Sequence, residues 1–126
     1  MSPTLVVTTE RAPSTAVDAW SAAGAKVAVV AAAEGGGVDL HETIALLGRE
    51  GALQVLVEGG GALLGAVLAG RHAQRLVAYI APVLLGDRGR PGYALAGPDT
   101  LSAAPRYQLV DVIRRGPDLC AVYEVA

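Results

Sequence analysis

The apolar pattern of this chain changes its period from one segment to the next, and this alternation is the feature that most limits its fold. Residues 4–9 (TLVVTT) are rich in β-branched side chains and predict a strand. Pro13 and Ser14 then open a short predicted helix, which ends at Gly24. Residues 26–31 predict a second strand with almost no polar alternation, as expected for a strand covered on both faces.

The alternation of strands and helices continues through the middle of the chain. Asp39, with Glu42 three residues later, predicts a capping box at the start of a helix that ends at Gly51. Residues 54–58 predict a third strand, and residues 61–69 predict a third helix. Strands that alternate with helices in this way favour a mainly parallel sheet with helices on its faces.

Beyond Arg75 the pattern becomes that of an antiparallel structure. Residues 76–85 predict a long strand that Pro82 interrupts, because proline removes a donor from the ladder. Residues 86–106 predict a loop, and uninterrupted loops of that length are usually functional or mobile. Residues 107–114 and 119–125 predict a terminal hairpin. The expected fold class is α/β: a mixed, mainly parallel sheet flanked by helices, with a C-terminal antiparallel hairpin, in a single domain over residues 1–126.

Composition and charge narrow the classes of function. A net charge of −2 with scattered signs offers no basic surface to nucleic acid or to a membrane, which leaves a small molecule as the expected ligand. The uncharged run at residues 59–70 is too short to span a bilayer. Cys120 is the single cysteine, so the chain has no internal disulfide and no cysteine-rich zinc site, and we expect a cytoplasmic protein without a bound metal.

A candidate ligand site lies where the third predicted strand turns into the third helix. Glu58 ends that strand, and Gly59, Gly60 and Gly61 follow it directly. Ligands of α/β sheets gather at the carboxyl ends of strands, and a helix N-terminus offers unpaired N–H groups to an anion. A carboxylate beside these amides suits a sugar phosphate or a nucleotide. The alternative is that the glycines only permit a tight turn and that Glu58 is a solvated strand end.

Two common phosphate motifs do not fit this stretch. The dinucleotide fingerprint needs a small residue at the sixth position, where this chain has Leu64. It also needs an acidic residue about twenty positions further on, and this chain has none there. A P-loop would require a Gly-Lys-Ser/Thr sequence, which does not follow. No nucleophile motif of the Gly-x-Ser-x-Gly type is present either.

The sequence LVEGGGAL at residues 56–63, followed by LVAYIAPVLLG at residues 76–86 and a terminal hairpin, resembles the C-terminal reductase domain of the bacterial riboflavin-biosynthesis deaminase/reductase. The resemblance covers nearly all of the chain and implies a dihydrofolate-reductase-like fold. It implies an NADPH-dependent oxidoreductase that reduces the ribose of 5-amino-6-(5-phosphoribosylamino)uracil to the ribityl form, and a homodimer. By this resemblance Glu58 contacts the substrate and Gly59 to Gly61 line the cofactor phosphates. It assigns no catalytic side chain, because the nicotinamide supplies the hydride.

A second group of candidates lies in the long loop. Arg88 and Arg90 stand among glycines, and arginine forks match the oxygens of a substrate or cofactor phosphate. The alternative is a solvated surface turn. The family usually has an uncharged residue where Asp87 stands, which argues against transferring a role to this loop.

Members of the family carry an earlier segment that supplies many substrate and cofactor contacts, and by the resemblance we expect this sequence to begin after it. We therefore expect an incomplete reductase domain with little turnover of its own. The alternative function is a non-catalytic nucleotide-binding or assembly module that keeps the same α/β core.

Overall fold

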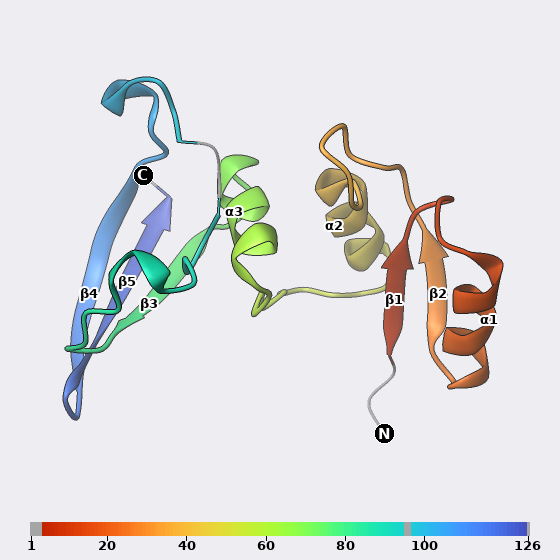
Figure 1. Cartoon of the computed structure of the whole chain (residues 1–126), viewed down its shortest axis with the longest axis horizontal. Coiled ribbons are helices and arrows are strands. Elements are labelled where there is room, and N and C mark those ends of the chain that lie inside the picture. The colour runs from red at the N-terminus through yellow and green to blue at the C-terminus, as the bar shows by residue number, and fades with distance from the viewer. Residues whose placement is uncertain (1–3, 95–96, 126) are drawn as a thin grey trace. The chain divides into compact units, whose positions relative to one another are not determined.

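A computed structural model describes residues 4–94 and 97–125 of the chain. These residues form two compact units, one within Met1–Val55 and the other within Leu56–Ala126. Figure 1 colours the chain from red at its N-terminus to blue at its C-terminus, and each unit combines helical structure with a sheet of its own.

The first unit contains two strands that alternate with two helices, in the order β1 (Leu5–Thr8), α1 (Ser14–Ala22), β2 (Lys26–Val29) and α2 (Leu40–Arg49). The strands pair in parallel, with Leu5 opposite Lys26 and Thr8 opposite Val29. Parallel neighbours need a crossover connection, and α1 provides it here. The strands and helices predicted for this part of the chain are thereby confirmed.

The N-terminus of α2 is capped, but only half of the predicted capping box forms. Asp39 Oδ1 accepts a hydrogen bond from the Glu42 amide at 2.7 Å. In a complete box the Glu42 side chain would return to the Asp39 amide, yet that amide donates to the Ala31 carbonyl at 2.8 Å. The Glu42 carboxylate instead accepts from the Ala31 amide, so this side chain ties α2 to the chain that leaves β2.

The strand predicted at Gln54–Glu58 is wrong. The described residues form a two-stranded sheet and a three-stranded sheet, and this segment belongs to neither. The division between the two units falls within it, and the Leu56 side chain is 79% exposed. An apolar run gives a chain the tendency to be extended, but a strand also needs a neighbour with which to form a ladder, and no described segment pairs with these residues.

The second unit contains one helix, two short 3₁₀ turns and three strands. Its elements are α3 (Gly61–Ala69), β3 (Arg75–Ile80), η1 (Gly86–Arg88), η2 (Leu101–Ala103), β4 (Tyr107–Arg115) and β5 (Asp118–Val125). The sheet has the order β3-β5-β4, and β5 pairs antiparallel with both neighbours. The predicted hairpin is confirmed, whereas β3 ends at Ile80, earlier than predicted and before Pro82.

The buried apolar residues lie mostly in α3 and in the central strand β5. Val67 and Leu68 of α3 are 7% and 8% exposed, and Cys120 and Ala121 of β5 are 4% and 5% exposed. In the first unit, Val30, which directly follows β2, is buried. The combination of helices, a parallel strand pair and an antiparallel hairpin sheet confirms the mixed α/β class. That the two units form a single domain stays a prediction.

Candidate functional site

The N-terminus of α3 carries no side-chain cap. Gly60 is the N-cap residue, with an extended backbone at φ −67° and ψ 172°, and Gly61 is the first helical residue. No side chain accepts a hydrogen bond from the first-turn amides of this helix, which leaves them available to an external acceptor. Glu58 lies two residues before the cap and is exposed.

The three glycines at this turn have different surroundings. A Cβ at Gly60 would meet nothing within 4 Å, whereas a Cβ at Gly59 would lie 2.5 Å from Leu63 Cδ2, the end of a flexible side chain. A Cβ at Gly61 would lie 2.8 Å from the Pro91 carbonyl oxygen, which is backbone. Gly61 is thus required for close packing, and the space at Gly60 remains open to a ligand.

The loop that carries the candidate arginines reaches the same turn. The Ala94 amide donates to the Gly61 carbonyl oxygen at 2.7 Å, and Pro91 packs against Gly61 as described above. Arg90 directly precedes Pro91 in the sequence. The structure therefore brings the chain around Arg90 to the first turn of α3. Two groups of candidate residues that are far apart in sequence thus belong to segments whose backbones are in contact.

Arg88 and Arg90 are both exposed. Neither guanidinium forms an ion pair with a described residue, in contrast to Lys26, which pairs with Glu50 at 2.6 Å, and Arg75, which pairs with Glu124. Two cationic side chains without a carboxylate partner are available to an anionic ligand.

The sequence analysis missed a hollow of about 530 Å³ in the first unit. It lies beyond the carboxyl ends of β1 and β2 and is lined by Thr9, Glu10 and Arg11, by residues 29–32 and by Glu42. This edge of a parallel sheet is where ligands usually gather. The polar residues Thr9, Glu10 and Arg11 are the feature of the sequence that could have indicated this hollow. Only the pairing of β1 with β2 shows that these residues lie beside the end of β2.

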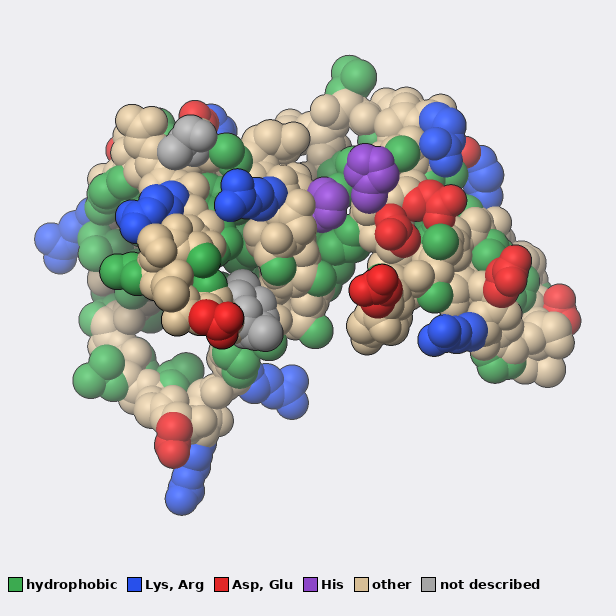
Figure 2. Space-filling view, turned by 90° about the horizontal axis from the view of Figure 1, so that it is seen from above, with side chains coloured by type: hydrophobic (Ala, Val, Ile, Leu, Met, Phe, Trp, Pro, Cys, Tyr) green, Lys and Arg blue, Asp and Glu red, His purple; other side chains and the backbone are tan. Residues whose placement is uncertain are grey.

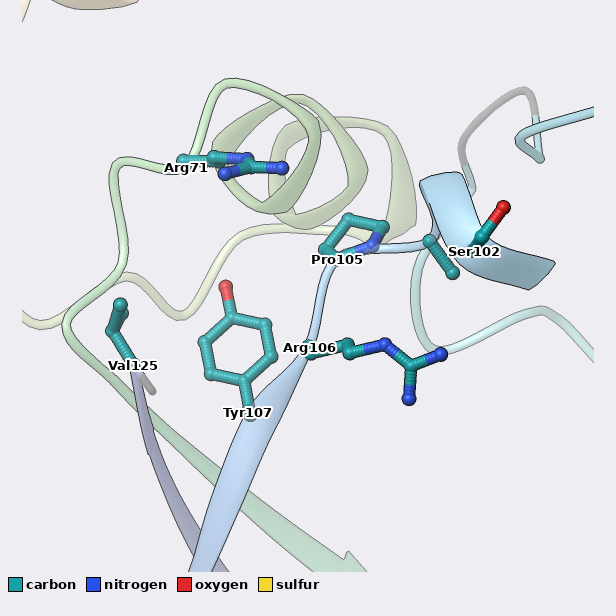
Figure 3. Close-up of a pocket in the computed structure, with 7 residues that line it drawn as sticks. Arg71, Ser102, Pro105, Arg106, Tyr107 and Val125 are labelled. Carbon is teal, nitrogen blue, oxygen red and sulfur yellow. The ribbon is translucent and has the colours of Figure 1, made fainter. Parts of the chain in front are cut away.

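A second hollow, of about 290 Å³, lies in the other unit and is shown in Figure 3. It is lined by Arg71, Ser102, Ala104, Pro105, Arg106, Tyr107 and Val125. In this view the Tyr107 hydroxyl points toward the side on which Arg71 lies, whereas the Arg106 side chain extends away from both. Since the charged groups do not converge on one point, the turn at α3 is the stronger candidate.

The surface charges, the distribution of metal-binding side chains and the lengths of the helices add three observations. On the face shown in Figure 2, basic and acidic side chains are scattered, and the basic ones form no continuous patch. Among residues 4–94 and 97–125, no three His, Cys, Asp or Glu side chains lie close enough to hold a metal ion. Within that same part of the chain, no helix has the length and apolarity needed to cross a membrane.

The fold defines the class of protein: a mixed α/β protein with the dihydrofolate-reductase-like arrangement. The chain belongs to the RibD C-terminal domain family, whose family model matches residues 1–121. It is 39% identical over 104 residues to the riboflavin biosynthesis protein RibD of Chlamydia pneumoniae, a match that covers 82% of this chain and 27% of the relative. With RibD of Escherichia coli it shares 35% identity over 85 residues, which cover 68% of this chain and 23% of the relative.

Solved structures agree on the fold. Acinetobacter baumannii RibD matches with a TM-score of 0.69 in its form 2 and 0.66 in its form 1, at 20% and 21% sequence identity. Each match covers 95% of this chain and 36% of the solved chain. The chain therefore spans about a quarter of the length of the curated relatives and about a third of the solved structures.

Proposed function

We propose that the chain is the C-terminal portion of a riboflavin-type reductase domain, and that this domain uses NADPH to reduce the ribose of a phosphoribosylamino-pyrimidine to the ribityl form. The observation that carries the proposal is the open turn at Gly60, in a member of the RibD C-terminal domain family. NADPH would supply the hydride when bound, and the protein would supply binding and orientation.

The residues at the turn fit the anionic part of such a cofactor. The uncapped amides of Gly60 and Gly61 can donate to phosphate oxygens, and the absence of a Cβ at Gly60 lets those oxygens approach the backbone. Arg88 and Arg90 would neutralise phosphate charge from the loop that reaches Gly61. Glu58 would accept hydrogen bonds from hydroxyls of the substrate sugar.

We also propose that the hollow beyond β1 and β2 contacts a nucleotide. Its lining combines the hydroxyl of Thr9 with the charged side chains of Glu10 and Arg11 and the apolar side chains of Val29 and Val30. Polar groups beside an apolar wall are what a nucleotide requires, since its base stacks or packs while its sugar and phosphates form hydrogen bonds.

We further propose that the protein works as a homodimer in the cytoplasm. The sheet of the second unit leaves large apolar side chains uncovered, among them Val77 and Tyr79, which are 46% and 68% exposed. Association through this sheet would remove them from water. Light scattering at increasing concentration tests this proposal, and a constant monomer mass would contradict it.

A non-catalytic binding module is the second candidate function. It is favoured by one observation, namely that the segment Gln54–Glu58 joins no sheet, so that no ladder fixes Glu58 in place. Reduction requires reacting atoms held within about 3.5 Å, and a displacement of about 1 Å can lower the rate a hundredfold. Binding at a helix N-terminus tolerates more movement.

The deciding experiment measures NADPH oxidation with the pyrimidine substrate for this chain and for a longer version, in which the chain replaces the matching part of a full-length RibD relative. We expect turnover in the longer version and little in this chain. Glu58→Gln in the longer version should raise the KM for substrate, whereas Glu34→Gln, a change at an exposed glutamate outside the site, should not. Equal rates for the two lengths would contradict the expected difference in turnover, and binding without turnover in either would favour the non-catalytic module.

A further inference from the structure

Gly65, one helical turn after Gly61, is a glycine that neither the candidate motif nor the proposed function uses. It is buried within α3. A Cβ at this position would lie 1.9 Å from the Ala94 carbonyl oxygen and 2.6 Å from its carbonyl carbon. Because these are backbone atoms, they cannot turn aside as the tip of a side chain can. Only glycine admits the chain at Ala94 this closely.

Gly61 and Gly65, which have no side chains, together form a flat packing surface on α3 for one segment of backbone. We call this surface the seat. Residues four apart lie on the same face of a helix, so both glycines face the same neighbour. That neighbour is Pro91–Ala94, which approaches Gly61 through the Pro91 carbonyl oxygen and donates from the Ala94 amide to the Gly61 carbonyl oxygen at 2.7 Å. Contact with the helix at two successive turns fixes both the position and the direction of this segment.

The other end of the same loop is also defined by its backbone. Gly86 has a positive φ of 67°, and the Gly89 amide donates to its carbonyl oxygen at 3.2 Å within the turn η1. Arg88 is therefore the last residue of this turn, and Arg90 lies between the turn and the seat on α3. We call residues 86–94 the arginine loop.

We infer that Gly65 is a positioning residue, which holds the arginine loop on α3 and thereby places Arg88 and Arg90 for a phosphate-bearing ligand. This inference rests on the proposed function, because the role of the two arginines belongs to that proposal. Gly65 itself would touch no ligand. A substituent at Gly65 would displace the Ala94 backbone and with it the chain that follows Arg90.

The experiment compares Gly65→Ala with Gly48→Ala. Gly48 is the matched control, because it also lies in a helix, while a Cβ there would meet nothing within 4 Å. Hydrogen exchange of peptides that cover the arginine loop should be at least about tenfold faster in Gly65→Ala and unchanged in Gly48→Ala. The affinity for NADP⁺, measured by calorimetry, should fall about tenfold in Gly65→Ala alone.

A double-mutant cycle distinguishes positioning from a general structural role. In an Arg88→Gln/Arg90→Gln background, Gly65→Ala should cause less than about a twofold further loss of affinity, since the groups that it positions are gone. An equal loss in both backgrounds, or no loss in either, overturns the inference. Should Gly65→Ala fail to fold, Ala94→Pro removes the hydrogen bond to Gly61 from the loop side and should give the same non-additive pattern.

Failure of the proposed function has a different signature. If the parent protein does not bind NADP⁺, the proposed cofactor site is wrong. Hydrogen exchange of the arginine loop then tests only whether Gly65 holds this loop on α3. Unchanged exchange in Gly65→Ala would overturn the seat as well. If the parent binds NADP⁺ and the loss of both arginines leaves the affinity unchanged, the positioning role is refuted while cofactor binding stands.

Discussion

Removal of the Asp39 side chain tests the local account of how the first unit is held together. Asp39→Ala deletes the acceptor that lies 2.7 Å from the Glu42 amide at the start of α2. The main-chain carbonyl oxygen of Asp39 remains, and it still accepts from the Thr43 hydroxyl at 2.6 Å and from the Thr43 amide at 3.0 Å. The substitution therefore removes one capping hydrogen bond and leaves the remainder of the turn intact.

The expected cost is about 1 kcal/mol, within the range of roughly 0.5–2 kcal/mol measured when a capping side chain is replaced by alanine. Asp39→Asn is the matched control. It keeps an oxygen acceptor at the same place, and asparagine is about as good an N-cap as aspartate. It loses only the favourable charge at the N-terminus of the helix, which contributes about 0.3–1 kcal/mol at an exposed site.

Urea unfolding followed by tryptophan fluorescence measures this difference, because the single tryptophan, Trp20, lies in the same unit as α2. We expect Asp39→Ala to lower the midpoint without changing the slope, which would indicate lost stability rather than a different extent of unfolding. Equal losses in the alanine and asparagine variants would show that charge and not the hydrogen bond stabilises this helix. No loss in either would refute the assignment of Asp39 as an effective cap.

Two further predictions concern the sheet of the second unit. Cys120→Ser should lower the free energy of unfolding by about 1–3 kcal/mol, because its hydroxyl would enter a position that is 4% exposed, and Cys120→Ala should lower it less. In the parent protein a thiol reagent should react with Cys120 only as fast as the sheet opens. Rapid labelling of the folded protein would contradict the burial of this thiol. Arg75→Gln should change the free energy of unfolding by less than about 1 kcal/mol, because the side chains of Arg75 and its partner Glu124 are 62% and 43% exposed. The difference should vanish in 1 M salt, where charges are screened over about 3 Å. A larger loss that persists in salt would mean that the pair is more than an exposed surface contact.

Elements specified by local signals were predictable from the sequence. The helix over Gly61–Ala69 has the predicted bounds, because a glycine turn opens it and Gly70 closes it. The hairpin follows from two β-branched runs on either side of a turn that contains Gly116 and Pro117, and Gly116 has the positive φ of 62° that such a turn uses. The segment Gln54–Glu58 shows the limit, since hydrophobic periodicity predicts an extended chain but not the neighbour that would make it a strand.

The candidate site was predictable in its parts rather than in its arrangement. Glu58 and the glycines stand where the sequence places them, before and at the start of a helix. What local reasoning cannot provide is contact between distant segments. The packing of Ala94 on Gly65 assigns a role to a glycine outside the motif, and the hollow beside Thr9 and Arg11 exists only because β2 ends next to β1. Whether these residues bind a cofactor and a substrate stays a prediction.

The order of strands in the second sheet has a consequence for the synthesis of the protein. β5 lies between β3 and β4, yet it follows both of them along the chain. While the ribosome produces the polypeptide from its N-terminus, β3 and β4 emerge with their inner edges unpaired, and neither can complete its ladder until β5 has left the exit tunnel. Exposed apolar strands with open edges are the species that chaperones bind and that aggregate when chaperones are scarce. A ribosome that pauses within β5 would therefore leave the nascent chain in its most vulnerable state, with β3 and β4 both synthesised and the strand that joins them incomplete.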